Sequence, residues 1–263
     1  MLLVSLSMRN AQLPLSQIVF AILYLHGASV EAFARDTQVQ LDVGAYVSRG
    51  DYGNTEATKI AFLPLSLRVQ LGRSYLKLNS GWAEINGPGN VDTQEKSDST
   101  RRTRGLGDTY LAAGHSWFTG ATLPLDWLTG EVKLKFPTAD ASQGLGTGKF
   151  DYLLSVSGYR PLGRLALHGT LMYRWRTSPI NTALLNTGGV SLGVIYLVTA
   201  RLSLGTQWEV HQSSTSSGAR RNELMPYVSV RLAPDVSLMF YTQIGFADGS
   251  PDRALGTQVG YRF

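Results

Sequence analysis

The chain lacks cysteine and is poor in charged residues, and each shortage excludes a class of protein. With no cysteine among 263 residues, it has no disulfide framework, no cysteine-ligated metal or iron–sulfur site and no thiol nucleophile. Charged residues make up 16% of the chain, against about 25% in ordinary soluble domains. A mean hydropathy of -0.04 is too low for a bundle of membrane helices, each of which needs roughly 20 apolar residues.

Glycine and large aromatic residues, in contrast, are abundant. The chain has 28 glycines, 12 tyrosines and 5 tryptophans, and this glycine content exceeds the usual ~7% without the strict period of collagen. Together with the low charge and the missing cysteine, this composition favours a β-barrel of the bacterial outer membrane.

The amino terminus has the pattern of an export signal. Arg9 supplies a positive charge, the stretch 13–25 is mostly apolar, and Ala32-Phe33-Ala34 forms an A-x-A cleavage signature. The apolar stretch is shorter than a spanning helix requires. We therefore predict a signal peptide over residues 1–34 and a barrel domain over 35–263; the alternative is an uncleaved membrane anchor.

After the signal, apolar and polar residues alternate with a period of two. In the stretch 201–211 one face carries Leu202, Leu204, Trp208 and Val210, and the other carries Arg201, Ser203, Gln207, Glu209 and His211. Successive side chains of a strand point to opposite faces, so each such stretch predicts a strand with one apolar and one polar side.

About twelve such strands are predicted, near 37–47, 58–71, 74–85, 106–119, 128–137, 149–160, 164–176, 187–198, 201–211, 223–232, 236–246 and 254–263. They are long enough to cross a bilayer, which takes roughly 9–11 tilted residues. Short connections alternate with long polar ones, as periplasmic turns alternate with extracellular loops in outer-membrane barrels. The predicted fold is all-β, a closed antiparallel transmembrane barrel in a Gram-negative outer membrane; a soluble β-sandwich is the alternative.

Aromatic residues support the membrane assignment. Rings that lie toward the predicted strand ends, where outer-membrane barrels carry aromatic girdles, are Tyr75, Trp82, Trp117, Phe118, Trp127, Phe136, Tyr152, Trp175 and Phe246. The last predicted strand ends with Tyr261 and Phe263 on its apolar face. A terminal phenylalanine on an alternating strand resembles the signal that the barrel-assembly machinery recognises, so this machinery and the outer-membrane lipids are expected partners.

Four stretches carry a family resemblance. They are Leu63-Pro-Leu-Ser-Leu-Arg68, Gly105-Leu-Gly-Asp108, Lys135-Phe-Pro-Thr-Ala-Asp140, and Gly144-Leu-Gly-Thr-Gly148 with Phe150-Asp151. In this order they resemble the outer-membrane family named for the meta-pathway of phenol degradation, although Ala139 stands where a glycine is usual. The resemblance implies a transporter or channel for small solutes, often aromatic or other hydrophobic compounds.

The acidic residues of these motifs have two interpretations. Asp108, Asp140 and Asp151 bind a cation at the barrel rim through oxygen ligands, or they cap turns by accepting backbone N–H bonds. We favour the capping interpretation, and we predict no metal and no cofactor.

The polar strand faces predict a charged lumen. The lumen and selectivity candidates are Arg68, Lys133, Lys135, Arg164, Arg174, Arg201, Glu209, Arg231 and Arg262. Five of these arginines, at 68, 164, 201, 231 and 262, fall near the short turns, where a charged ring would select anions. Alternatively, the arginines pair with Glu209, Glu223 and Asp42 and close the lumen. We favour a narrow conduit that prefers anions.

Other functions receive less support from the sequence. An outer-membrane hydrolase would have to use His115-Ser116 or the pair of His168 and His211, but neighbouring residues of a strand point to opposite faces. We therefore do not expect an enzyme. A structural or secretion-linked barrel with a closed lumen is the main alternative, and dispersed basic residues predict no nucleic-acid partner.

Overall fold

The computed structural model describes residues 37–52, 56–90, 95–120, 123–180 and 183–263. The predicted signal peptide and the predicted mature start near Arg35 lie outside these residues. In the described part of the chain, no helix is both long enough and apolar enough to cross a membrane.

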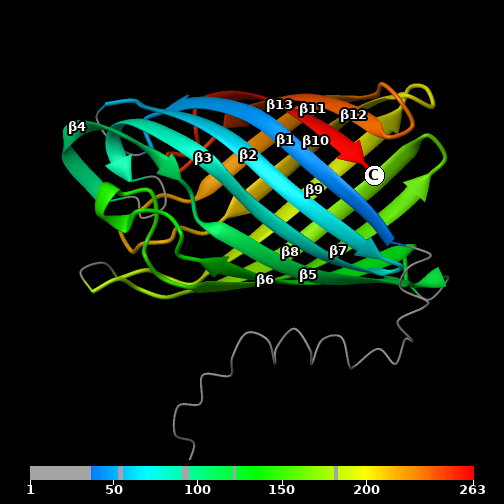
Figure 1. The fold of residues 1–263 in the computed structure, drawn as a ribbon, viewed down its shortest axis with the longest axis horizontal. Helices are drawn as coiled ribbons and strands as arrows, with labels where there is room; N and C mark the ends of the chain where they lie inside the picture. The colour runs from blue at the N-terminus through cyan, green and yellow to red at the C-terminus, as the bar shows by residue number, and fades with distance from the viewer. Residues whose placement is uncertain (1–36, 53–55, 91–94, 121–122, 181–182) are drawn as a thin grey trace, which may run out of the picture. The chain divides into compact units, whose positions relative to one another are not determined.

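Strands make up almost all of the regular structure that is described (Figure 1). They are β1 (Thr37–Gly50), β2 (Thr58–Leu71), β3 (Ser74–Asn90), β4 (Glu95–Leu106), β5 (Thr109–Phe118), β6 (Trp127–Phe136), β7 (Asp151–Leu162), β8 (Leu165–Arg176), β9 (Thr187–Leu197), β10 (Leu202–His211), β11 (Arg221–Arg231), β12 (Val236–Gly245) and β13 (Arg253–Arg262). A single-turn 3-10 helix, η2 (Ala141–Gln143), lies between β6 and β7.

The strands close into a ring. Neighbours pair antiparallel around the sheet, β2 also pairs with β3, and β1 pairs with β13 from Gln40–Arg262 to Arg49–Arg253. Closure removes the free sheet edges whose unpaired N–H and C=O groups hydrocarbon does not tolerate. The predicted closed antiparallel barrel of twelve strands, with short periplasmic turns and long extracellular loops, is confirmed.

One strand was not predicted. Except for Leu106, β4 lies within the stretch 86–105, which was expected to be a loop. It pairs with the upper part of β3, while β5 pairs with the lower part. Gly107 continues the ladder between them by donating to the Gly81 carbonyl at 2.8 Å. β4 thus extends one barrel strand toward the extracellular side. A strand outside the hydrocarbon needs no apolar face, so its sequence carries no alternation.

Burial in this barrel is the reverse of that in a soluble protein. Large apolar side chains such as Leu204 and Leu171 are exposed on the outer face, whereas the largest fully buried described side chains include Lys135 and Asp151, both 0% exposed. Tyr173–Trp175 and Phe118–Trp127 contacts lie on the outer face near strand ends, as the predicted girdle requires. Tyr75 is an exception, because its ring points inward.

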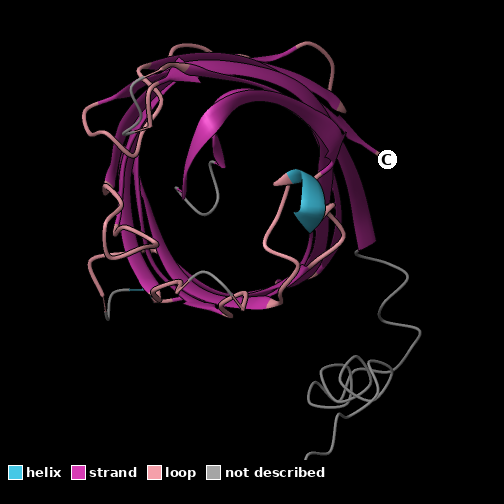
Figure 2. Ribbon diagram, turned by 90° about the vertical axis from the view of Figure 1, so that its left-hand side faces the viewer, coloured by secondary structure: helices cyan, strands magenta, loops and turns pink. Residues whose placement is uncertain are grey.

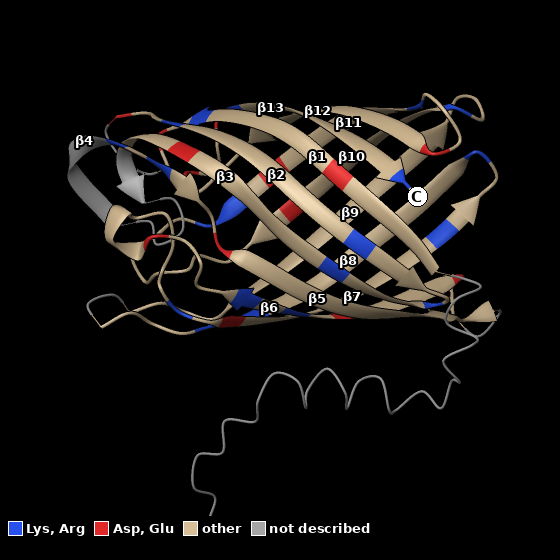
Figure 3. Cartoon of the chain, in the orientation of Figure 1, with Lys and Arg blue, Asp and Glu red and all other residues tan. Residues whose placement is uncertain are grey.

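Two segments narrow the extracellular opening. Seen along the barrel, η2 and the curled hairpin of β3 and β4 lie over the opening within the ring of strands (Figure 2). Charged positions follow the strands themselves as well as the loops (Figure 3). The inner wall and these two segments therefore set the chemistry of the lumen.

Candidate functional site in the barrel lumen

Three of the sequence motifs meet at one buried lysine. Lys135, near the end of β6, places its Nζ 3.1 Å from Asp108 Oδ2 and 3.2 Å from Asp151 Oδ2. The same ammonium donates to Thr147 Oγ1 at 2.7 Å. Asp108 comes from the second motif, Thr147 and Asp151 come from the fourth, and Lys135 itself belongs to the third, so one cluster joins three of the four motifs. We call Lys135, Asp108, Asp151, Thr147 and Arg174 the loop clamp.

The loop clamp fixes the connection between β6 and β7. Arg174 Nε donates to Asp151 Oδ2 at 3.0 Å, and the backbone N–H of Ala139 donates to Asp108 Oδ1 at 3.1 Å. A methyl group added at Gly146 would lie 2.9 Å from both Asp108 carboxylate oxygens, so only glycine fits there. Removing one partner of such a buried ion cluster typically costs about 3–5 kcal/mol. The loop that carries η2 is therefore tied to the wall.

These contacts change the interpretation of several predicted site residues. Lys135 was predicted to line the lumen, yet its side chain is 0% exposed and is enclosed by its partners. Asp108 and Asp151 bind this lysine through one carboxylate oxygen each, and with the other they accept backbone N–H groups, from Ala139 at 3.1 Å and from Thr177 at 3.2 Å. Asp140 does cap a turn, since its carboxylate accepts from the Ser142 N–H at 2.9 Å. The Ser142 hydroxyl also donates to it, which lowers the pKa of Asp140.

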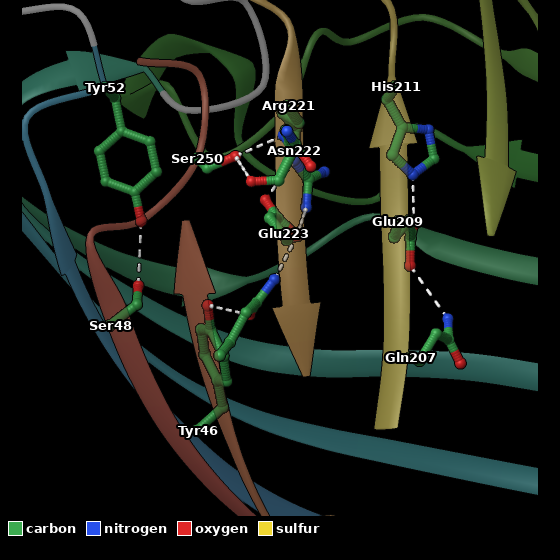
Figure 4. A network of polar contacts seen from close by, with 11 residues as sticks. Tyr46, Ser48, Tyr52, Gln207, Glu209, His211, Arg221, Asn222, Glu223 and Ser250 are labelled. Atoms are coloured by element: carbon green, nitrogen blue, oxygen red, sulfur yellow. Dashed lines mark hydrogen bonds and ion pairs between the residues drawn. The ribbon is translucent and has the colours of Figure 1, made fainter. Parts of the chain in front are cut away.

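A second polar network lies on β10 and β11 near the extracellular end (Figure 4). Arg221 Nε donates to Glu223 Oε1 at 2.9 Å, and Gln243 also donates to Glu223. Glu209, the register partner of Glu223, is hydrogen-bonded to His211 and accepts from Gln207 at 3.2 Å. Glu209 was predicted as a lumen residue; the structure places it in this paired network.

This network reaches the first extracellular loop through tyrosines. Tyr46 donates to Gln243 Oε1 at 3.1 Å, and the hydroxyls of Ser48 and Tyr52 lie 3.1 Å apart. Burial raises the pKa of Tyr52 well above its usual value, so the residue stays neutral. Arg221 was not a predicted candidate, because it falls in the stretch 212–222 that was expected to be a loop.

A row of cations crosses the wall between these two networks and the periplasmic end. Arg68 faces Lys77 across β2 and β3, Lys77 faces Ala112, Ala112 faces Lys133, and Lys133 is followed by Leu153 and Arg174 in the same register row. Arg68 lies three residues from the periplasmic end of β2, while Arg174 lies two from the extracellular end of β8. The row therefore runs obliquely along the lumen from its periplasmic end toward its extracellular end.

A cavity of about 210 Å³ opens on the wall below this row. It is lined by Tyr75, Thr129, Glu131, Lys133, Leu153, Ser155, Ser157, Thr170 and Met172. Tyr75 was predicted in the outer girdle, but its hydroxyl donates to Glu131 Oε2 at 2.6 Å inside the barrel. Its ring lies against Gly114, where any side chain would clash. The sequence contains a signal for this orientation that was missed: Tyr75 and Lys77 are two residues apart on β3, so their side chains point to the same face.

The remaining predicted arginines gather at the periplasmic end. Arg164 precedes β8, Arg201 precedes β10, and Arg231 and Arg262 end β11 and β13. All four are exposed. Their positions continue the alternation of inward-facing residues in the adjoining strands. The basic ring at the periplasmic mouth remains a prediction.

The sheet separates His115 and Ser116, the first of the two predicted enzyme pairs. His115 Nδ1 lies 2.8 Å from the Ser74 hydroxyl and packs against Trp117 on the outer face, whereas the Ser116 hydroxyl lies 2.8 Å from that of Thr129 on the inner face. Among the described residues, no group of three or more His, Asp or Glu is placed to hold a metal ion.

The sequence of the chain matches one family of known proteins. The family model described as "Putative MetA-pathway of phenol degradation" matches residues 21–263. No curated protein matches the sequence.

Solved outer-membrane proteins share the fold. An outer membrane channel from Pseudomonas putida F1 has a TM-score of 0.64 at 17% identity, over 86% of this chain and 95% of that one. The KdgM porin has a TM-score of 0.52 at 11% identity, over 85% and 98%. The translocator domain of the autotransporter NalP from Neisseria meningitidis has a TM-score of 0.51 at 12% identity, over 94% and 98%. The chain is thus a β-barrel of the bacterial outer membrane, and it belongs to the family described as the putative MetA-pathway of phenol degradation.

Proposed function

We propose that this protein is a passive channel that passes small solutes across the outer membrane and prefers anions. The observation that carries the proposal is the row of Arg68, Lys77 and Lys133, three cations that face two carboxylates, Glu131 and Asp42. A charged lining in a narrow pore raises the local concentration of ions of opposite sign. The exposed arginines at 164, 201, 231 and 262 would extend the same potential to the periplasmic mouth.

Small aromatic or other hydrophobic compounds are the proposed solutes. Support comes from the family description, which refers to phenol degradation, and from apolar side chains such as Leu153 and Met172 on the inner wall. The role proposed here is passage and not catalysis, since His115 and Ser116 lie on opposite faces of β5.

A structural barrel with a closed lumen is the second candidate. It is favoured by the loop clamp and by the Glu209 and Glu223 network, in which charges pair across the extracellular half. Single-channel recording on protein purified from outer membranes distinguishes the two candidates. We expect discrete conductance steps with a reversal potential on the anion side; the absence of conductance would support the closed barrel.

The last two aromatic residues are proposed as the assembly signal. Tyr261 and Phe263 pack edge to face with ring centroids 4.8 Å apart on the outer face of β13, and Phe263 is 70% exposed. Replacing Phe263 by Asp should leave the lumen unchanged but prevent assembly. Loss of heat-modifiable mobility on gels would show this, and normal folding of the variant would contradict it.

A further inference from the structure

Charge is unevenly distributed around the lumenal cavity. Lys133 Nζ lies 3.3 Å from Glu131 Oε1, and Glu131 also accepts a hydrogen bond from the Tyr75 hydroxyl. Beyond this pair, Lys77 interacts electrostatically with Lys133, Glu131, Asp42 and Arg68. Three cations thus face two carboxylates on this part of the wall, and Asp42 is buried and accepts from Gln40 at 2.8 Å. The wall carries a net positive charge beside a half-buried ammonium group.

Apolar and hydroxyl side chains follow this cation in a regular order. Leu153 is the register partner of Lys133, and Met172 is the register partner of Ser155 one step below. One further step down, the Ser157 and Thr170 hydroxyls lie 2.9 Å apart. From top to bottom the cavity therefore offers a cation, an apolar patch and a pair of hydroxyls.

The Tyr75 ring makes one side of this arrangement rigid. The Arg68 guanidinium lies 3.8 Å from its ring centroid, and the ring fits against Gly114, which leaves no room for another side chain. A stacked arginine is a favourable cation–π contact. At about 210 Å³ the cavity is smaller than the roughly 300–1,000 Å³ of pockets for drug-sized ligands, so it fits a single-ring compound.

We propose that this cavity is a lumenal binding subsite for small aromatic carboxylates. The carboxylate pairs with Lys133, the ring lies on Leu153 and Met172, and a ring hydroxyl reaches Ser157 or Thr170. The inference rests on the proposed channel function and names its solute class. A neutral phenol can make the apolar and hydroxyl contacts, but it has no carboxylate to pair with the Lys133 ammonium group.

Equilibrium binding to the full chain in detergent micelles tests this subsite. Titration calorimetry with benzoate, phenol, acetate and benzylammonium distinguishes the contribution of the ligand's charge to binding from that of its aromatic ring. We expect benzoate to bind about tenfold more tightly than each of the others, a factor that corresponds to about 1.4 kcal/mol. This measurement needs no conductance, so a protein that binds benzoate but does not conduct would overturn the channel and leave the subsite standing.

Two variants with opposite expected effects on benzoate affinity extend the test. Lys133→Gln should weaken benzoate binding about tenfold, whereas Glu131→Gln should strengthen it, because a like charge is removed while the amide oxygen still accepts from Tyr75. Lys59→Gln is the matched control, since Lys59 is exposed on the outer face of β2. Ser157→Ala combined with Thr170→Val should remove the advantage of 4-hydroxybenzoate over benzoate. Heat-modifiable mobility on gels confirms that each variant is folded.

Two results would overturn the inference. One is equal affinity for benzoate and phenol, which would show that the cavity takes neutral rings. The other is unchanged benzoate affinity in folded Lys133→Gln, which would place any anion site elsewhere in the barrel.

Discussion

The two ends of the barrel use arginine and lysine in opposite ways. At the extracellular end, Lys135 is fully buried and holds the connection between β6 and β7 to the wall, and Arg221 is paired with the buried Glu223. At the periplasmic end, Arg201 and Arg262 are exposed beside the short turns. The same residue types thus serve folding at one end and, in our account, solute selection at the other.

Solvation explains the difference. A buried charge is stable only when it is paired and hydrogen-bonded, so the buried Lys135 lies between two carboxylates and the buried Glu223 lies beside Arg221. An exposed charge keeps its hydration and acts at a distance that is limited by salt screening. Substitutions at the two ends should therefore change different measurable properties.

The largest expected effect is on the loop clamp. Asp151→Asn leaves Lys135 and Arg174 without their shared carboxylate and should lower the free energy of unfolding by about 3–5 kcal/mol. Urea unfolding in micelles measures the change. Asp140→Asn, an exposed carboxylate in the same connection, is the control and should have little effect. Equal stabilities of the two variants would mean that the clamp does not hold the loop.

A somewhat smaller effect is expected from the outer face. Leu204→Arg places a charge on the lipid side of β10, whereas Gln207→Arg places one on the lumen side of the same strand. A basic residue on the lipid face costs roughly 2–4 kcal/mol at mid-bilayer, while lumen positions tolerate it. Unfolding of both variants in lipid vesicles tests the register, and equal tolerance would show that the two faces are assigned wrongly.

The smallest expected effect is a change in the mobility of η2 when the pH is lowered. Hydrogen bonds from Ser142 lower the pKa of Asp140 in the folded loop, so this cap is complete at neutral pH and is lost as the pH falls through that lowered pKa. Because the chain has no other cysteine, a fluorophore attached at Ala141→Cys reports on η2 alone. Its anisotropy should drop on acidification, and Ser142→Ala should move the drop to higher pH. An anisotropy that is independent of pH would contradict the capping role.

Most of the barrel is predictable from the sequence, because hydrocarbon imposes a period of two on every crossing strand. The strands around Leu204 and Leu171 were found in this way. β4 was missed because Glu95–Leu106 lies outside the hydrocarbon and carries no such period. Lys135 was predicted as a lumen residue, yet its burial also depends on Thr147, which approaches only when the connection between β6 and β7 folds inward.

The reversal potential under a salt gradient tests the central claim, that the exposed cations of the periplasmic end set selectivity and the paired cations of the extracellular end set structure. Replacing Arg201, Arg231 and Arg262 together with Gln should shift it toward non-selectivity, and the shift should shrink as salt shortens the screening length from about 10 Å at 0.1 M to about 3 Å at 1 M. Replacing the paired Arg221 with Gln should destabilise the barrel but leave the reversal potential near the wild-type value. An unchanged potential in the triple variant, or a comparable shift in the Arg221 variant, would contradict the account.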